Sequence, residues 1–273
     1  MYILLRSLVR TLFAAFGLGL ISAKKVQYLE SARIQRDNIV NKVPLLLLLN
    51  SRQLIDNEEM GLFLDSPSEN GQDIFALVAS GKKKSGTFIE FGAYNGVDFS
   101  NTYLLERHFG WGGVLVEPIP SSYSKIQESR SCIAIHGAVT PQDQEAVLIK
   151  EVPANNLSYV SERSFNLFER AMSRMHRVTG YSISSIMMKF LHSTYVDFLS
   201  VDVEGLELEI LSMVDFDRYS FGAICVEHNN SENKNGIRRL LESKNYSLVM
   251  EELSGNDFWY VHHSQKERFS SAT

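Results

Sequence analysis

The sequence predicts an α/β fold built on a doubly wound, mostly parallel sheet. Two observations carry this prediction. Short apolar, β-rich runs alternate with helical patterns along the chain, and the first two runs both end in a carboxylate. The first run ends at Glu90 and turns through glycines, and the second ends at Glu117 about one βαβ step later. Because ligands of such sheets lie beyond the carboxyl ends of the strands, we expect a pocket between these two acids.

Seven strands are expected in the main sheet. The first five alternate with helices, as in a parallel sheet, and the last two form a closing pair that gives the sheet an antiparallel edge. A helix is expected to begin at residue 72, ahead of the first strand. The expected strands are 87–91, 114–117, 132–136, 197–201, 223–226, 247–251 and 258–262.

The alternation breaks down over residues 141–193. We expect an extra strand over 145–152 and two helices over 161–177 and 182–191, rich in Arg, Met and Phe. An insertion before the fourth core strand lies at the rim of the pocket. We therefore expect this segment to act as a lid.

The first 25 residues form an apolar, basic segment that contains no acid. Its apolar run, residues 11–23, would span roughly 20 Å as a helix, short of a ~30 Å bilayer core, but counting from residue 3 gives about 20 residues. A short signal-anchor, a cleaved signal peptide, an amphipathic helix lying on a membrane and a buried soluble helix all fit this pattern. We favour a retained membrane anchor. Residues 26–65 are expected to form a helical linker, 66–265 the main domain and 266–273 a flexible tail.

The composition argues against several classes of function. A chain of 273 residues with 44% hydrophobic and 22% charged residues suits one sizeable globular domain with an extension. A net charge of −5 gives no reason to expect nucleic-acid binding. The two cysteines, Cys132 and Cys225, lie in apolar runs, so neither a disulfide framework nor a cysteine metal site is expected.

The loop after the first strand favours S-adenosylmethionine (SAM) over a dinucleotide. A dinucleotide loop usually has three glycines that aim amides at pyrophosphate, whereas this loop reads E-x-G-x-x-x-G through Glu90, Gly92 and Gly96. A carboxylate there would repel pyrophosphate but suits the ammonium and sulfonium groups of SAM. Glu117 would then grip the ribose hydroxyls. A nicotinamide site and a plain turn with two surface acids are the weaker interpretations.

Three segments of the chain resemble the FkbM family of class I SAM-dependent methyltransferases. They are residues 70–73, 86–118 and 197–207, and the likeness extends over about 66–262. The resemblance implies a Rossmann-like sheet, SAM as cofactor and methylation of hydroxyls on sugars or other natural products. One departure is Asn95, where the family often has Asp.

Within this fold, the first three strand ends are expected to bind the cofactor. Glu90 would anchor the methionine moiety, and the glycines would let the backbone approach the ligand. Residues after the first and third strands would line the same cavity and flank the adenine. The expected cofactor-binding residues are Glu90, Gly92, Ala93, Asn95, Gly96, Asn101, Thr102, Glu117, Ala138 and Val139.

The fourth and fifth strand ends are expected to serve the acceptor. A hydroxyl loses its proton during methyl transfer, and a positioned base helps this step. Asp202 is the favoured base or orienting group, His228 has the better intrinsic pKa and is second, and Glu204 is third, unless it only caps the next helix. No metal is expected, although Asp202, Glu227 and Asn229 could gather around one divalent ion.

The sequence therefore predicts a SAM-dependent O-methyltransferase that acts on a hydroxyl of a sugar, glycolipid or related natural product. It also predicts membrane contact through the N-terminal segment, with the catalytic domain on the SAM-containing, cytoplasmic side. The alternatives are the same fold acting on another nucleophile, and a membrane-anchored binding or trafficking protein without turnover.

Overall fold

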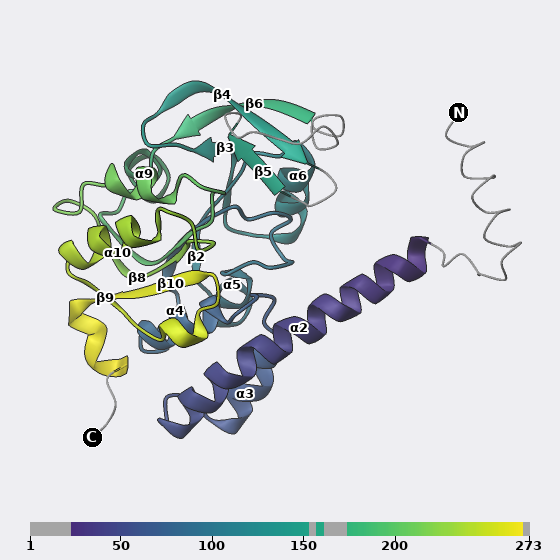
Figure 1. Ribbon diagram of the computed structural model, residues 1–273, viewed down its shortest axis with the longest axis vertical. Helices are drawn as coiled ribbons and strands as arrows, with labels where there is room; N and C mark the ends of the chain where they lie inside the picture. The colour runs from purple at the N-terminus through teal and green to yellow at the C-terminus, as the bar shows by residue number, and fades with distance from the viewer. Residues whose placement is uncertain (1–22, 153–156, 161–173, 270–273) are drawn as a thin grey trace, which may run out of the picture.

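A computed structural model describes residues 23–152, 157–160 and 174–269, which fold around one mixed sheet (Figure 1). Within these residues the sheet has ten strands. In sheet order they are β5 (Leu157–Val160), β4 (Gln144–Val152), β6 (Arg174–Tyr181), β3 (Ile133–Val139), β2 (Gly112–Glu117), β1 (Thr87–Phe91), β7 (Tyr195–Val201), β8 (Ser220–Glu227), β10 (Asp257–His262) and β9 (Tyr246–Leu248).

The predicted doubly wound sheet is confirmed in its central part. Strands β3, β2, β1, β7 and β8 are mutually parallel, β10 runs antiparallel to β8, and β9 runs antiparallel to β10. From β1 the chain adds β2 and β3 on one side and later adds β7 and β8 on the other, so the order of the strands reverses between β1 and β7. This reversal is the topological switch point, where the loops after neighbouring strands diverge and leave room for a ligand.

Helices cover both faces of the sheet. Along β10, Trp259 belongs to one buried cluster with Phe75, and Tyr260 belongs to a second cluster with Ile237. Because neighbouring strand residues point to opposite faces, the two clusters are the cores on the two sides of the sheet. The helices are α2 (Ala23–Ser51), α3 (Asn57–Leu64), α4 (Gln72–Ala79), α5 (Tyr103–Phe109), α6 (Pro120–Ser129), α8 (Ile183–Ile186), α9 (Glu207–Ser212) and α10 (Lys234–Ser243).

The insertion between β3 and β7 extends the sheet, so the expectation of seven strands is too low. Strand β6 adds parallel to β3, β4 pairs antiparallel with β6, and β5 with β4. The helix expected over 161–177 is wrong for 174–177, which open β6. Exposed Arg177 and Thr179 alternate there with buried Val178 and Gly180, a strand period. Residues 161–173 lie outside the described part. The helix expected over 182–191 is present as α8 and a π-helical turn, Met187–Leu191.

The segment expected to be a linker packs into the core. Leu45, Leu46 and Leu49 of α2 and Phe63 of α3 are fully buried in the same cluster as Phe75. In Figure 1 the N-terminal part of α2 extends beyond the sheet. The proposed membrane segment falls mainly on residues 1–22, outside the described residues. Among the helices of the described part, none is both long and apolar enough to cross a bilayer.

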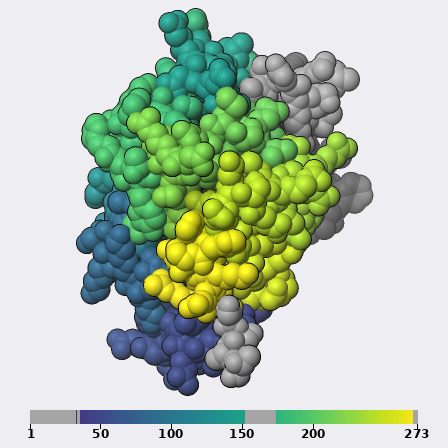
Figure 2. Space-filling view, turned by 90° about the vertical axis from the view of Figure 1, so that its left-hand side faces the viewer, coloured from purple at the N-terminus to yellow at the C-terminus, as the bar shows by residue number. Residues whose placement is uncertain are grey.

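The C-terminal residues are ordered further than expected. The flexible tail expected from residue 266 is wrong for 266–269, which belong to a 3-10 helix, His263–Phe269. Phe269 is buried against Phe75, and its carbonyl oxygen accepts a hydrogen bond from Arg52. In Figure 2 the yellow C-terminal elements lie directly against the purple N-terminal helices. Residues 270–273 are outside the described part.

The pairing of β1 with β2 requires a glycine at position 113. A Cβ on Gly113 would lie 2.0 Å from the carbonyl oxygen of Phe88, its partner in β1. We expect Gly113→Ala to lower the free energy of unfolding by about 2 kcal/mol or more, because the backbones of the two central strands must separate. Gly112→Ala is the matched control, since a Cβ there meets nothing within 4 Å. It should be neutral or stabilise by up to about 1 kcal/mol. Urea unfolding measures both, and equal effects would contradict the argument.

Candidate functional site

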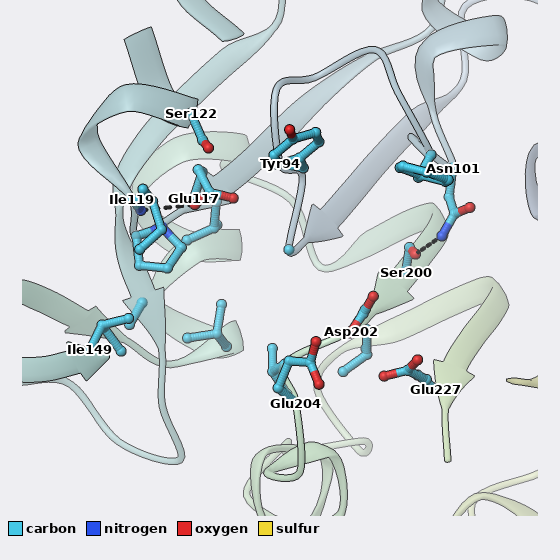
Figure 3. A pocket seen from close by; sticks show the side chains of 18 of the residues that line it. Tyr94, Asn101, Glu117, Ile119, Ser122, Ile149, Ser200, Asp202, Glu204 and Glu227 are labelled. Carbon is cyan, nitrogen blue, oxygen red and sulfur yellow. Dashed lines mark hydrogen bonds between the residues drawn. The ribbon is translucent and has the colours of Figure 1, made fainter. Parts of the chain in front are cut away.

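A cavity of about 530 Å³ opens at the carboxyl ends of the central parallel strands (Figure 3). It lies at the switch point. Its walls come from the ends of β2, β3, β7 and β8 and from the loops after β1, β2 and β7, with contributions from α4, α6, β4 and β10. Both polar and apolar side chains face it. The wall contains Glu69, Gln72, Gly92, Tyr94, Phe99, Asn101, Val116, Glu117, Pro118, Ile119, Ser121, Ser122, Lys125, Gly137, Ala138, Val139, Ile149, Glu151, Ser200, Val201, Asp202, Val203, Glu204, Cys225, Glu227 and Asp257.

Gly92 brings the β1 loop against the β7 loop. It has a φ of +72°, and a Cβ at this position would lie 2.5 Å from the carbonyl oxygen of Asp202. Only glycine meets both conditions without strain. Gly92 therefore lets the backbone form the cavity floor between the first and fourth strand ends. The next residue, Ala93, is buried and does not line the cavity.

Glu90, expected to anchor the methionine moiety, lies behind the loop rather than in the cavity wall. Its side chain is 2% exposed. One carboxylate oxygen accepts a hydrogen bond from the backbone N–H of Asn101 at 2.7 Å. The other accepts from the Ser100 and Thr102 hydroxyls. Glu90 thus fixes the far end of the loop that surrounds the ligand.

Asn95 and Gly96 shape the same loop and do not line the cavity, contrary to expectation. Asn95 Oδ1 accepts hydrogen bonds from the amides of Val97 and Asp98 at 3.0 and 2.8 Å, which closes a tight turn. Gly96 has a φ of +79°, and a Cβ there would lie 3.0 Å from Arg130 Cγ. The second glycine of the motif therefore serves packing against α6 rather than contact with a ligand.

The two polar residues at the start of α5 face opposite ways. Asn101 lines the cavity, and its amide donates to Ser200 Oγ at 2.9 Å, as drawn in Figure 3. Its Oδ1 atom is buried without a partner in the described structure. Thr102 is fully buried behind the loop, where it donates to Glu90, so its expected place in the wall is corrected.

Glu117 lies in the wall at the end of β2 and is 4% exposed. Its Oε1 accepts a hydrogen bond from the Ile119 amide at 2.8 Å (Figure 3), and the Tyr94 amide donates to the same carboxylate. Burial nevertheless raises the pKa of Glu117 to about 7. Ala138 and Val139, from β3, form an apolar strip beside it with Ile119.

Three carboxyl groups gather on the other side of the cavity, at the ends of β7 and β8. Asp202 and Glu227 lie close together, and Glu204 adds a third negative charge nearby. Burial and the neighbouring carboxylates raise the pKa of both Asp202 and Glu227. The pair therefore holds a proton at a higher pH than free carboxyls do, and it titrates as one unit.

The loop after β7 is strained where it meets the cavity. Glu204 has a φ of +57°, a conformation that costs a non-glycine residue energy. Glu207, at the start of α9, accepts hydrogen bonds from the amides of Val203 and Gly205 at 3.3 and 2.9 Å. Glu207 therefore holds this loop in place, while Glu204 contributes to the wall.

His228, the second candidate base in the sequence, does not line the cavity. The ring is 3% exposed, packs on Phe258 at 4.4 Å, and accepts a hydrogen bond from the Asn230 amide through Nδ1. Burial and Lys234 lower its pKa, which favours the neutral ring. Asn229 also lies outside the wall. Within the described residues, no group of three His, Cys, Asp or Glu side chains is arranged to hold a metal ion.

The part of the cavity wall beside Glu227 was not predicted from the sequence. Gln72, at the start of α4, donates through Nε2 to Asp257 Oδ2 at 2.6 Å, and both are buried. Asp257 lies directly across the β8–β10 ladder from Glu227. Glu69 completes this side. The segment 70–73 was part of the resemblance, but nothing in it indicated a partner 185 residues away.

The family described as "Methyltransferase FkbM domain" matches residues 90–248. No curated protein matches the chain.

Three solved structures align with weak overall similarity. A precorrin-6y C5,15-methyltransferase from Geobacter metallireducens GS-15 is 10% identical, with a TM-score of 0.39 over 71% of this chain and 86% of that one. A fibrillarin/Nop5p complex is 12% identical (TM-score 0.35, 71% and 80% covered), and the CurJ carbon methyltransferase is 12% identical (TM-score 0.37, 89% and 70% covered).

The family match spans more than half of the chain and includes the cavity-lining ends of β1, β2, β3, β7 and β8. The chain belongs to the FkbM methyltransferase domain family.

Proposed function

We propose that this SAM-dependent methyltransferase transfers the methyl group to a hydroxyl oxygen of a neutral, hydroxyl-rich acceptor such as a sugar, a glycolipid or a related natural product. The observation that carries the proposal is the Asp202–Glu227 carboxyl pair, which faces the cavity across from Glu117 (Figure 3). A hydroxyl must lose its proton during the attack, whereas a thiolate is already deprotonated and a neutral amine can attack through its lone pair. The pair offers a place for that proton.

The residues at the β1, β2 and β3 ends fit SAM. Gly92 leaves room for close backbone approach, Glu117 presents a buried carboxylate for the ribose diol, and Ala138 and Val139 give an apolar surface for adenine. Among the described lining residues there are seven carboxylic acids and one amine, Lys125. This balance suits a ligand with ammonium and sulfonium charges and disfavours one with phosphates.

SAM supplies a methyl group on a sulfonium, ready for displacement by a nucleophile. The chain contributes alignment and proton removal. Ser200 and Asn101 lie on the Asp202 side of the cavity (Figure 3) and can orient polar groups there. The raised pKa of the Asp202–Glu227 pair makes its ionised oxygen a stronger base than an ordinary carboxylate. Asp202 and Glu227 therefore act as one base in this proposal, with Glu204 beside them.

Gln72 and Asp257 form the outer part of the acceptor side in this proposal. Together they offer an amide and a carboxylate, which can exchange hydrogen bonds with neighbouring hydroxyls of one acceptor. An acceptor with a phosphate or carboxylate here would meet Glu69, Asp257 and Glu227 and be repelled.

Cofactor affinity should fall as the pH drops below about 7. Burial raises the pKa of Glu117 to about 7, so at lower pH its proton must leave before the carboxylate accepts hydrogen bonds from both ribose hydroxyls. Binding of S-adenosylhomocysteine (SAH), measured by calorimetry, should weaken roughly tenfold per pH unit in that range. Glu117→Gln should bind more weakly at about pH 8 and lose most of this slope. An unchanged slope would show that another group controls it.

Loss of either member of the carboxyl pair should reduce turnover rather than cofactor binding. We expect Asp202→Asn and Glu227→Gln to lower methyl transfer roughly 10²-fold or more, with SAH affinity within about threefold of wild type. The assay transfers labelled methyl from SAM to a panel of methyl glycosides and glycolipids, with amine and carboxylate analogues alongside. Asp217→Asn, on the exposed β7–β8 connection, is the control. Transfer only to the analogues would sink the hydroxyl proposal, and SAH binding without any transfer would favour a binding protein.

Changes at Gln72 should affect the acceptor alone. Gln72→Leu removes the donor to Asp257 and leaves that carboxylate unpaired, so we expect a raised KM for the best acceptor of the panel by roughly tenfold. The KM for SAM should stay near the wild-type value. A change in both constants would place Gln72 in the cofactor half.

A further inference from the structure

The guanidinium of Arg130 is a buried charge beside the cofactor loop. Arg130 caps the C-terminal end of α6, and its side chain is 0% exposed. The guanidinium lies 5.6 Å from the ring centres of both Phe88 and Tyr103. Its Nε donates to Glu106 Oε2 at 2.7 Å, so the charge is paired inside the protein.

The rest of the guanidinium binds the loop rather than Glu106. Nη1 donates to the Gly96 carbonyl oxygen at 2.8 Å and to Ser100 Oγ at 3.1 Å, and Nη2 donates to Thr102 Oγ1 at 2.9 Å. Ser100 and Thr102 in turn donate to Glu90. One planar group therefore fixes three points of the loop and connects it to the end of β1.

The elements joined by Arg130 form two walls of the cofactor cavity. The loop supplies Tyr94, Phe99 and Asn101, and α6 supplies Ser122 and Lys125. Glu117, expected to hold the ribose, accepts a hydrogen bond from the Tyr94 amide, so it depends on the loop position. Because Arg130 belongs to α6 and binds the loop, it sets the separation of the two walls.

We propose that Arg130 is a positioning residue for SAM: it holds the loop after β1 at the distance from α6 that the cofactor requires. Glu106 pairs the charge of Arg130 and accepts a hydrogen bond from the Ser131 amide, without touching the loop. A guanidinium presents several donors in a rigid fork, whereas a lysine ammonium is a single point. Lysine at this position would keep the ion pair and lose the simultaneous contacts to the Gly96 carbonyl and the Ser100 and Thr102 hydroxyls.

Two variants of the full-length protein separate positioning from stability. Arg130→Lys should bind SAH roughly tenfold more weakly, since misplaced contacts in a preorganised site cost affinity. Glu106→Gln removes the ion pair but leaves all three contacts between Arg130 and the loop. It should lower the Tm by roughly 6–20 °C, because the buried guanidinium loses its counter-charge, and it should keep SAH affinity within about twofold of wild type. Calorimetry and thermal unfolding without ligand measure both quantities.

A second pair of variants tests the contact at Thr102. Thr102→Val keeps the shape but removes the hydroxyl that links Arg130 to Glu90, and it should lose SAH affinity as Arg130→Lys does. Thr102→Ser keeps the hydroxyl and should restore most of that affinity. Arg107→Lys, on the exposed side of α5, is the control for the cation near Tyr103.

The proposal is overturned if Arg130→Lys and Glu106→Gln lose SAH affinity in the same proportion as they lose Tm. It is also overturned if Arg130→Lys binds SAH as wild type does. Both results leave SAM binding by the family intact, because wild-type SAH affinity is measured in the same series.

Discussion

A carboxylate buried at the end of a central strand costs several kcal/mol unless its oxygens are hydrogen-bonded. Glu90 is such a group, and the loop after β1 is built to satisfy it. The Asn101 amide and the Ser100 and Thr102 hydroxyls converge on its two oxygens. The hydrogen bonds that the buried Glu90 carboxylate requires therefore fix the position of residues 100–102 at the end of the loop. This position determines that Asn101 faces the cavity and that Thr102 does not.

The two halves of the cavity are built by different physical means. The cofactor half depends on backbone geometry. Gly92 allows a close approach of two loops, and backbone amides hold the Glu117 carboxylate in place. The acceptor half depends on uncompensated acidity: Asp202, Glu227 and Asp257 lie side by side, and Gln72 satisfies only one of them. Repulsion between these neighbouring carboxylates favours the uptake of a proton at the site where the acceptor has to lose one.

The sequence predicts the sheet well because strand ends and glycine turns are local signals. Glu117 and Asp202 could be placed near the cavity from their position after β2 and β7. Whether a side chain faces the ligand or the loop is not a local property, and this is why Glu90, Gly96 and His228 were assigned to the ligand. Strand β6 was missed because its first residues resemble a helix surface, and the role of Gln72 depends on β10, which no local pattern connects to it.

Both ends of the chain are needed to complete the acceptor wall. A Cβ on Gly71 would lie 2.7 Å from Leu45 of α2, and Gln72 next to it binds Asp257 across 185 residues. The order of synthesis follows from this arrangement. On the ribosome, the cofactor-side residues emerge before Asp257, because all of them precede it in the chain. The contact between Gln72 and Asp257 forms only after β10 has been released, so the acceptor wall is the last part of the cavity to be completed.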